Sequence, residues 1–208
     1  MDFLKRFFGH LKTTMTHKWW VFYYAYCFGY PWRGLIHDTS KLSPTEFLEG
    51  VKYWNGKRSP VLVAKEETGI SYAWLHHRGR NKHHYEYWID KLDDGGVPHK
   101  MPFKYVVEAV CDWLAACRTY TDNKDIFRAE YDWWEDRAPK VKMHDETKAL
   151  VHKILWNLKE MAKYNIYWEG KWVLSERDKW VIQSVAHCLG RWEAEYNGKE
   201  VKYDERDD

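Results

Sequence analysis

The sequence predicts an all-α protein with one small β-hairpin near its C-terminus. Apolar residues recur at three- and four-residue intervals through most of the chain, which is the spacing of one helix face. Helix-start signals occur at Ser43 and Ser175, each followed three positions later by an acidic residue that could bond back to the cap. Proline and glycine separate the helical stretches, as expected for short connections.

The elements follow from these signals in order. Pro31 and the flanking glycines end the first helix, and Pro44 after Ser43 begins the next, so residues 37–41 lie between helices. Only residues 166–174 show the pattern of a strand pair, turning at Glu169-Gly170. The expected helices cover 3–28 (one long helix or two abutting helices), 44–54, 61–78 (weakened at Gly69), 83 onward, 103–120, 125–135, 145–164 and 175–196, with a clear loop at 93–98.

The composition is that of a globular protein, since 45% of the 208 residues are hydrophobic and 31% are charged. A net charge of +2 gives no general surface for duplex nucleic acid. The four cysteines have no paired spacing, so neither a zinc knuckle nor a disulfide framework is expected. The chain opens without a secretory signal, and its most apolar run, residues 19–30, is too short to cross a bilayer. We therefore expect a cytoplasmic protein without a membrane partner.

Adjacent His37 and Asp38 are the centre of the candidate site, because a carboxylate can bridge two metal ions while an imidazole binds one. Other histidines and carboxylates recur at helical positions that can point into the middle of a bundle: His17, His76, His77, His83, His84, Glu108 and Asp112. Nitrogen and oxygen ligands suit iron, manganese or zinc, and the lack of cysteine argues against a structural zinc site.

Each of these residues also has a structural interpretation. The four downstream histidines could form a cationic patch with Arg78 and Arg80 that binds phosphate without metal. The His-Asp pair could cap a helix, as we expect for the second such pair, His144-Asp145, which lacks a following lysine and histidine cluster. The joint pattern around His37 favours a metal site. The remaining histidines, His10, His99, His152 and His187, are expected to be surface or packing residues.

Three segments carry a resemblance to a known superfamily. They are His-Asp-Thr-Ser-Lys-Leu-Ser-Pro-x-Glu-Phe at 37–47, His-His-x-x-x-Asn-x-His-His-x-x-x-Trp at 76–88 and Met-Pro-x-x-x-x-x-Glu-x-x-x-Asp-Trp at 101–113. Over residues 10–118 the chain resembles the HD-domain metalloproteins, and more narrowly an uncharacterised bacterial and phage family within them. One departure is Ser40, where the superfamily often has glycine.

The resemblance implies the role of each site residue. A first metal ion would be bound by His17, His37, Asp38 and Asp112, and a second by His77 with His83 or His84, with Asp38 bridging the two. Neighbouring residues on a helix point about 100° apart, and we favour His77 over His76. Lys41 would contact a substrate phosphate. Apart from the resemblance, their charge and position suggest Arg78 and Arg80 as further phosphate-binding residues, and Asn81 could orient a substrate sugar or a ligand histidine.

The resemblance also implies an organisation and an activity. Residues 1–122 would form an HD-domain-like metal-binding core. The resemblance does not cover the C-terminal third, and we expect 123–208 to be a helical extension packed on this core as a lid or a homodimer contact. The leading hypothesis is a phosphohydrolase in which two divalent ions activate a hydroxide, with Asp38 and Lys41 as catalytic residues and a nucleotide or other small phosphoester as substrate. An HD-type di-iron oxygenase is the first alternative, since the same ligands suit that chemistry. The second alternative comes from the tryptophan-rich C-terminal third and is a non-enzymatic helical binding protein, which could be phage-encoded.

Overall fold

The computed structural model describes residues 2–164 and 174–198. Helices make up nearly all of the regular structure in these two ranges, which confirms the all-α prediction. The α-helices are α1 (Phe3–Cys27), α2 (Pro31–Ile36), α3 (Pro44–Tyr53), α4 (Pro60–Thr68), α5 (Tyr72–Arg78), α6 (Phe103–Tyr120), α7 (Ile126–Arg137), α8 (Asp145–Tyr164), α9 (Leu174–Ala186) and α10 (Leu189–Tyr196). Short 3-10 turns cover η1 (Thr39–Leu42), η2 (Tyr85–Trp88) and η3 (Leu92–Asp94), and the strands are β1 (Ile89–Asp90) and β2 (Val97–Pro98).

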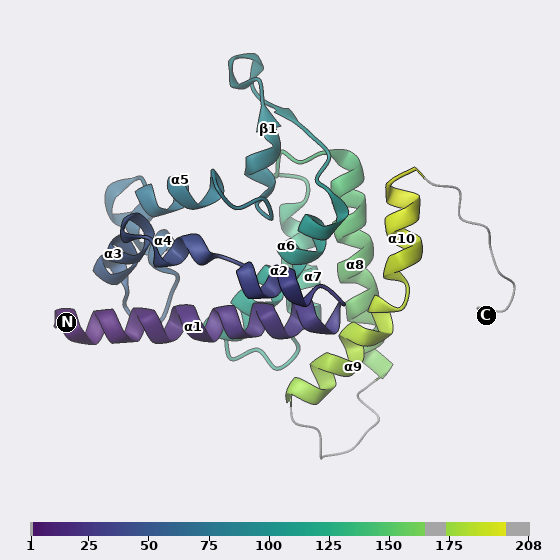
Figure 1. Ribbon diagram of the computed structural model, residues 1–208, viewed down its shortest axis with the longest axis horizontal. Helices are drawn as coiled ribbons and strands as arrows, with labels where there is room; N and C mark the ends of the chain where they lie inside the picture. The colour runs from purple at the N-terminus through teal and green to yellow at the C-terminus, as the bar shows by residue number, and fades with distance from the viewer. Residues whose placement is uncertain (1, 165–173, 199–208) are drawn as a thin grey trace, which may run out of the picture.

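Helix α1 is the axis of the arrangement. It runs along the lower part of the molecule in Figure 1, with α2 and α6 packed against it and α3 crossing its N-terminal half. Helices α7 and α8 pack against α6, while α9 contacts both α1 and α8. The histidine-bearing α1 and the aspartate-bearing α6 therefore lie side by side although far apart in sequence.

One cluster of buried apolar side chains holds these helices together. It includes Val21 of α1, Val110 of α6, Phe127 of α7, Ile154 of α8 and Ile182 of α9, each with no exposed surface. Burying a large apolar side chain stabilises a fold by about 1.5–3 kcal/mol, so this cluster fixes the position of α6 against α1. The expected division at residue 122 stays a prediction, and side chains from both sides of that position contribute to the cluster.

Two long predicted helices are wrong because each is interrupted. Gly69 adopts a left-handed φ of 78° and ends α4, and the Ser71 side chain then caps α5. Residues 61–78 therefore form two helices rather than one weakened helix. In the same way the predicted helix 175–196 is divided into α9 and α10 at residues 187–188.

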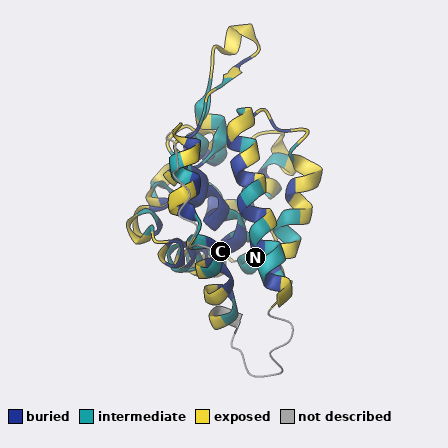
Figure 2. Ribbon diagram, turned by 90° about the vertical axis from the view of Figure 1, so that its right-hand side faces the viewer, coloured by how far each residue is buried: buried dark blue, intermediate teal, exposed yellow. Residues whose placement is uncertain are grey.

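A β-hairpin lies where a helix and a loop were expected. After η2 the chain forms an antiparallel pair in which Ile89 faces Pro98 and Asp90 faces Val97. The hairpin projects from the helices and is largely exposed (Figures 1 and 2). The hairpin predicted at 166–174 falls outside the described residues. No helix in the described part of the chain is both long enough and apolar enough to cross a membrane.

Candidate metal centre

The backbone at residues 37–38 turns two adjacent side chains toward one buried point. Helix α2 ends at Ile36, His37 takes an extended conformation, and Asp38 is left-handed with φ 51° and ψ 33°. A left-handed L-residue costs about 1–2 kcal/mol, and such strain often accompanies function. Lys18 of α1 donates to the His37 carbonyl at 2.5 Å and ties this turn to α1.

A first group of donors joins α1, this turn and α6. His17, His37, Asp38 and Asp112 are all buried, and one donor atom of each lies within 4.8 Å of the others. His37 Nε2 is 3.1 Å from Asp38 Oδ2 and 3.4 Å from Asp112 Oδ1, and His17 Nε2 is 2.9 Å from Asp112 Oδ1. The structure thus brings together all four residues expected at the first metal ion.

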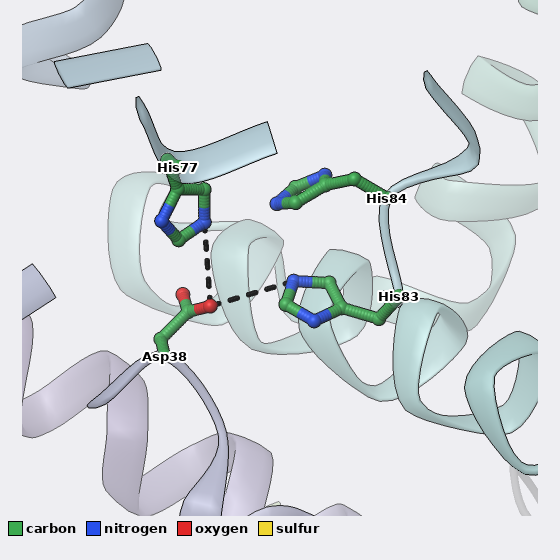
Figure 3. A group of neighbouring side chains, drawn as sticks. All are labelled: Asp38, His77, His83 and His84. Atoms are coloured by element: carbon green, nitrogen blue, oxygen red, sulfur yellow. Dashed lines mark ion pairs between the residues drawn. The ribbon is translucent and has the colours of Figure 1, made fainter. Parts of the chain in front are cut away.

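A second group surrounds the other oxygen of Asp38. His77 Nε2 lies 3.3 Å and His83 Nε2 3.4 Å from Asp38 Oδ1, and the His84 ring points into the same space (Figure 3). His77 comes from the end of α5, and His83 and His84 from the turn after it. The adjacent His76 points elsewhere, because its Nδ1 donates to Glu46 at 2.6 Å.

The spacing of these donors fits ligands of a shared ion. Two atoms about 2.1 Å from one ion are about 3.0 Å apart at a right angle and about 3.4 Å apart at the tetrahedral angle. The five donor pairs above span 2.9–3.4 Å. Buried polar atoms are normally hydrogen-bonded, yet the Nε2 atoms of His37, His83 and His84 form no hydrogen bond. The donor set therefore fits a metal ion, and Asp38 belongs to both donor groups.

Two glutamates orient the imidazoles from behind. Glu108 Oε1 lies 3.1 Å from His37 Nδ1 and 3.3 Å from His83 Nδ1, while its Oε2 accepts from Arg33. Glu46 accepts from His77 Nδ1 at 2.7 Å. A carboxylate on Nδ1 fixes the ring and leaves Nε2 free to bind metal, as around many metal-binding histidines.

Sequence reasoning missed the role of Glu46. The residue was expected to bond back to its helix cap, but only half of that motif forms: Ser43 Oγ accepts from the Glu46 amide at 3.5 Å. The Glu46 carboxylate turns inward to the α5 histidines instead. Its position in the 37–47 motif was the available signal. The same inward turn occurs at Asp178, whose carboxylate accepts from Tyr24 and Arg118.

Burial and neighbouring charges set the protonation states of this cluster. Burial disfavours ionised carboxyls, but the neighbouring histidines prevail and hold the pKa values of Asp38 and Asp112 well below their usual range. Burial would lower the pKa of His77, yet Asp38 and Glu46 raise it to about 9. Burial also lowers the pKa of His84 well below its usual value. The carboxylates are therefore ionised and the His84 ring is neutral at pH 7, while His77 must lose a proton to bind a cation.

A cavity of about 650 Å³ reaches this cluster. Five donor residues line it: His17, His77, His83, His84 and Asp112. Lys41 also lines it, with Nζ 2.6 Å from Asp38 Oδ2, so a cationic side chain stands beside the carboxylate that both donor groups share. Aromatic side chains, among them Trp74 and Trp113, form part of the wall.

The other predicted substrate-binding residues lie apart from this cavity. Arg80 and Asn81 line a second hollow of about 220 Å³ that also touches Asp38 and His83, and Arg78 lines neither. Asn81 Nδ2 donates to Ser40 Oγ at 2.8 Å and lies 3.0 Å from His77 Nδ1. Asn81 therefore supports a candidate ligand.

The histidines set aside from the site divide into two kinds. His99, His152 and His187 are exposed, and His144 accepts from the Glu146 amide at the start of α8, as expected of a cap. His10 differs, because it is buried and lines the large cavity.

Comparison with known proteins gives one match. The model of a family of unknown function, DUF5662, matches residues 6–157, about three quarters of the chain. No curated protein and no solved structure matches. The resemblance to HD-domain proteins has no counterpart in this comparison and stays a prediction. The matched range contains every donor of the buried cluster, and the chain belongs to the DUF5662 family.

Proposed function

We propose that this protein is a metal-dependent phosphohydrolase acting on a small phosphoester such as a nucleotide. The observation that carries the proposal is two buried donor groups that share Asp38, at the wall of a cavity that Lys41 also lines. The sequence resemblance to HD-domain proteins supports the same chemistry. A divalent cation held by these donors would supply Lewis acidity and lower the pKa of a water molecule.

The chain's own residues have separate tasks in this proposal. The Lys41 ammonium holds a phosphoryl oxygen, since a charged donor favours the anionic group. Glu46 and Glu108 keep the His77, His37 and His83 rings in place. In the net reaction the water oxygen bonds to phosphorus and the bond from phosphorus to the alcohol oxygen breaks. The two hydrogens of the water end on the alcohol and on phosphate.

The test begins with metal analysis of protein purified without chelator, followed by a phosphoester and nucleotide panel under anaerobic conditions with manganese. We expect stoichiometric transition metal and release of phosphate. Asp38→Asn should remove both, whereas the matched control His144→Gln, in the second His-Asp pair outside the donor cluster, should change neither. Iron-dependent consumption of dioxygen without phosphate release would replace the hydrolase with an oxygenase, and protein without metal or turnover would leave a binding role.

A further inference from the structure

One row of side chains on α1 connects the metal centre with the rest of the cavity. His10, Thr14 and His17 follow the i, i+4, i+7 spacing of one helix face, and all three are buried and line the 650 Å³ cavity. A rise of about 1.5 Å per residue places Thr14 about 4.5 Å and His10 about 10.5 Å along the helix from the candidate ligand His17. The row therefore leads from the reacting centre into the cavity.

His10 is tightly packed, but one of its ring nitrogens lacks a hydrogen-bond partner. Its ring is only 9% exposed, packs on Phe47 with ring centroids 5.1 Å apart, and has no hydrogen-bond partner on Nδ1. Helix α3 approaches it so closely that a Cβ on Gly50 would lie 2.3 Å from His10 Nε2. A buried histidine that only packs usually has its nitrogens bonded. His10 lines the cavity and its buried Nδ1 has no partner, which points to a ligand.

The protonation of His10 and Glu130 limits what these two side chains can bind. Burial, and then the charge of Lys41, lower the pKa of His10 to about 4, so the ring is neutral at pH 7. Glu130 of α7 also lines the cavity, and burial raises its pKa to about 8, so it too is neutral. A neutral imidazole, a hydroxyl and a neutral carboxyl each donate and accept hydrogen bonds without attracting an anion.

We infer that His10 and Thr14 form a subsite for a neutral hydrogen-bonding group, an amide or a hydroxyl, on the alcohol part of the substrate. This inference rests on the proposed phosphohydrolase activity and adds a substrate class to it. The phosphoryl group lies at the donor cluster beside Lys41, and the uncharged polar end of the same molecule lies one to two helical turns away along α1. His10 and Thr14 act in binding and are remote from the reacting atoms.

The test uses two probes, phenyl phosphate and 4-acetamidophenyl phosphate. Their leaving groups have similar acidity, and only the second carries a neutral amide at its far end. One hydrogen bond of about 0.5–1.5 kcal/mol corresponds to about a 2- to 10-fold lower KM for the amide probe. His10→Phe keeps the ring packing and Thr14→Val keeps the shape, so each should abolish that preference by raising KM for the amide probe alone, with kcat unchanged.

Thr14→Ser, which retains the hydroxyl, should keep the preference. A wild-type enzyme that hydrolyses both probes with equal KM, or variants that keep the preference, would overturn the subsite while leaving the proposed activity intact. Failure to hydrolyse either probe, or any member of the phosphoester panel, would overturn the activity and the subsite with it.

The outward face of α1 carries a second, independent feature, an apolar stripe. Its members repeat every eleven residues: Leu4, Met15 and Tyr26, then Phe8 and Trp19, then Leu11 and Phe22. At about 100° per residue these seven positions fall within an arc of about 80°, centred about 135° around the helix from the row that faces the cavity. Five of them are 48–62% exposed, and none of the described residues buries them.

The geometry points to a second copy of α1 as the occupant of this stripe. A narrow stripe with an eleven-residue period is typical of a seam between helices rather than of a broad lipid-facing surface. If each large side chain has about 200 Å² of surface, the exposed halves of the five residues together present on the order of 600 Å² of apolar surface. A stable dimer buries ~800 Å² per partner. Trp32 and Leu35 of α2, which packs against α1, are further exposed apolar side chains.

The charges of α1 select the antiparallel arrangement. Its cations, Lys5, Arg6, Lys12 and Lys18, all precede Trp19, and the helix contains no acidic residue. A parallel pair would place all four cations of one helix beside those of the other. An antiparallel pair centred on Met15 sets Lys5 and Arg6 against the uncharged aromatic end of the partner helix and leaves only Lys12 and Lys18 near each other.

Sedimentation at increasing protein concentration tests this interface. The wild type should be a dimer at micromolar concentration, and Phe8→Glu with Trp19→Glu should be a folded monomer. Leu92→Glu, at an exposed leucine in the hairpin, is the matched control and should remain a dimer. A monomeric wild type, a double variant that still dimerises, or a monomer that binds anionic phosphatidylserine vesicles through this stripe would overturn the inference.

Discussion

Glu108→Gln is the sharpest test of the metal centre, because it removes a charge without changing the shape of the side chain. One oxygen of Glu108 faces the Nδ1 atoms of His37 and His83, and the other accepts from Arg33. A glutamine amide has only one accepting atom, so in either orientation its NH₂ group meets a buried donor. Leaving such a donor unpaired costs about 1–3 kcal/mol of stability.

The larger effect should be on metal affinity. Loss of a carboxylate that orients a metal-binding histidine weakens binding about 10- to 100-fold. At a metal concentration of about 100 times the wild-type Kd, the metal adds about 2.7 kcal/mol to stability, and a 30-fold weaker site leaves about 0.9 kcal/mol. For a chain of this size each kcal/mol shifts Tm by about 2–4 °C. The metal-induced rise in Tm should therefore fall from about 5–11 °C to about 2–4 °C.

The assay is a thermal melt of chelator-treated protein, with and without added manganese, iron or zinc. Glu135→Gln is the matched control, because Glu135 also contacts a histidine, at 3.0 Å from His152 Nδ1, but both side chains are about half exposed. It should keep the full metal-induced shift. An equal shift in Glu108→Gln and wild type would refute the positioning role of Glu108, and a wild type that no metal stabilises would refute the metal centre.

Three further changes follow from the same contacts. Asp38→Asn should fold, because asparagine tolerates the left-handed backbone, but elemental analysis should show that it has lost metal. Asp38→Ala should add about 1–2 kcal/mol of backbone strain, measured by denaturant titration. Equal metal content in the two variants and wild type would contradict the bridging role. Because burial raises the pKa of Glu130 from 4.5 to about 8, its contribution to stability is complete below pH 4.5 and lost as the pH rises to 8. The fall in Tm between pH 6 and 8.5 should therefore be smaller in Glu130→Gln than in wild type. An equal fall in the two proteins would argue against this titration. Gly50→Ala should destabilise the protein by about 1–3 kcal/mol, because the added Cβ would clash with His10. Gly190→Ala, whose Cβ would meet nothing within 4 Å, should stabilise α10 by about 0.5–1 kcal/mol. Similar thermal melts for the two variants would show that α3 adapts to the larger residue.

Much of the fold could be predicted from local sequence. Helix α1 was expected over nearly its observed length, and Ser43 with Pro44 fixed the start of α3. The errors lie where a local signal has two outcomes. Gly69 was expected to weaken a helix and instead ends it. The strand at Ile89 has only two residues, which is too short to show an alternating pattern, so the helical periodicity of the neighbouring residues dominated the prediction.

The candidate site shows the same division between local and distant information. His17, His37, Asp38, His77, His83, His84 and Asp112 were selected from residue type and order, and the structure gathers all seven. The roles of Glu46, Glu108 and His10 were not assigned. Each depends on a contact across at least 31 positions of sequence or on a cavity, and no periodicity within one segment encodes such a contact.

The sequence by itself determined which chemical groups are present and that most of them lie on or between helices. It determined the turn at His37-Asp38, because Pro31 and the Ser43-Pro44 start leave a short connection there. Only the tertiary structure decided which atoms face each other. The packing of α6 on α1 sets Asp112 against His17, and the left-handed Asp38 reaches both donor groups. The reason is physical: helix periodicity fixes the face on which a side chain lies, whereas the packing of the apolar core fixes which other face it meets.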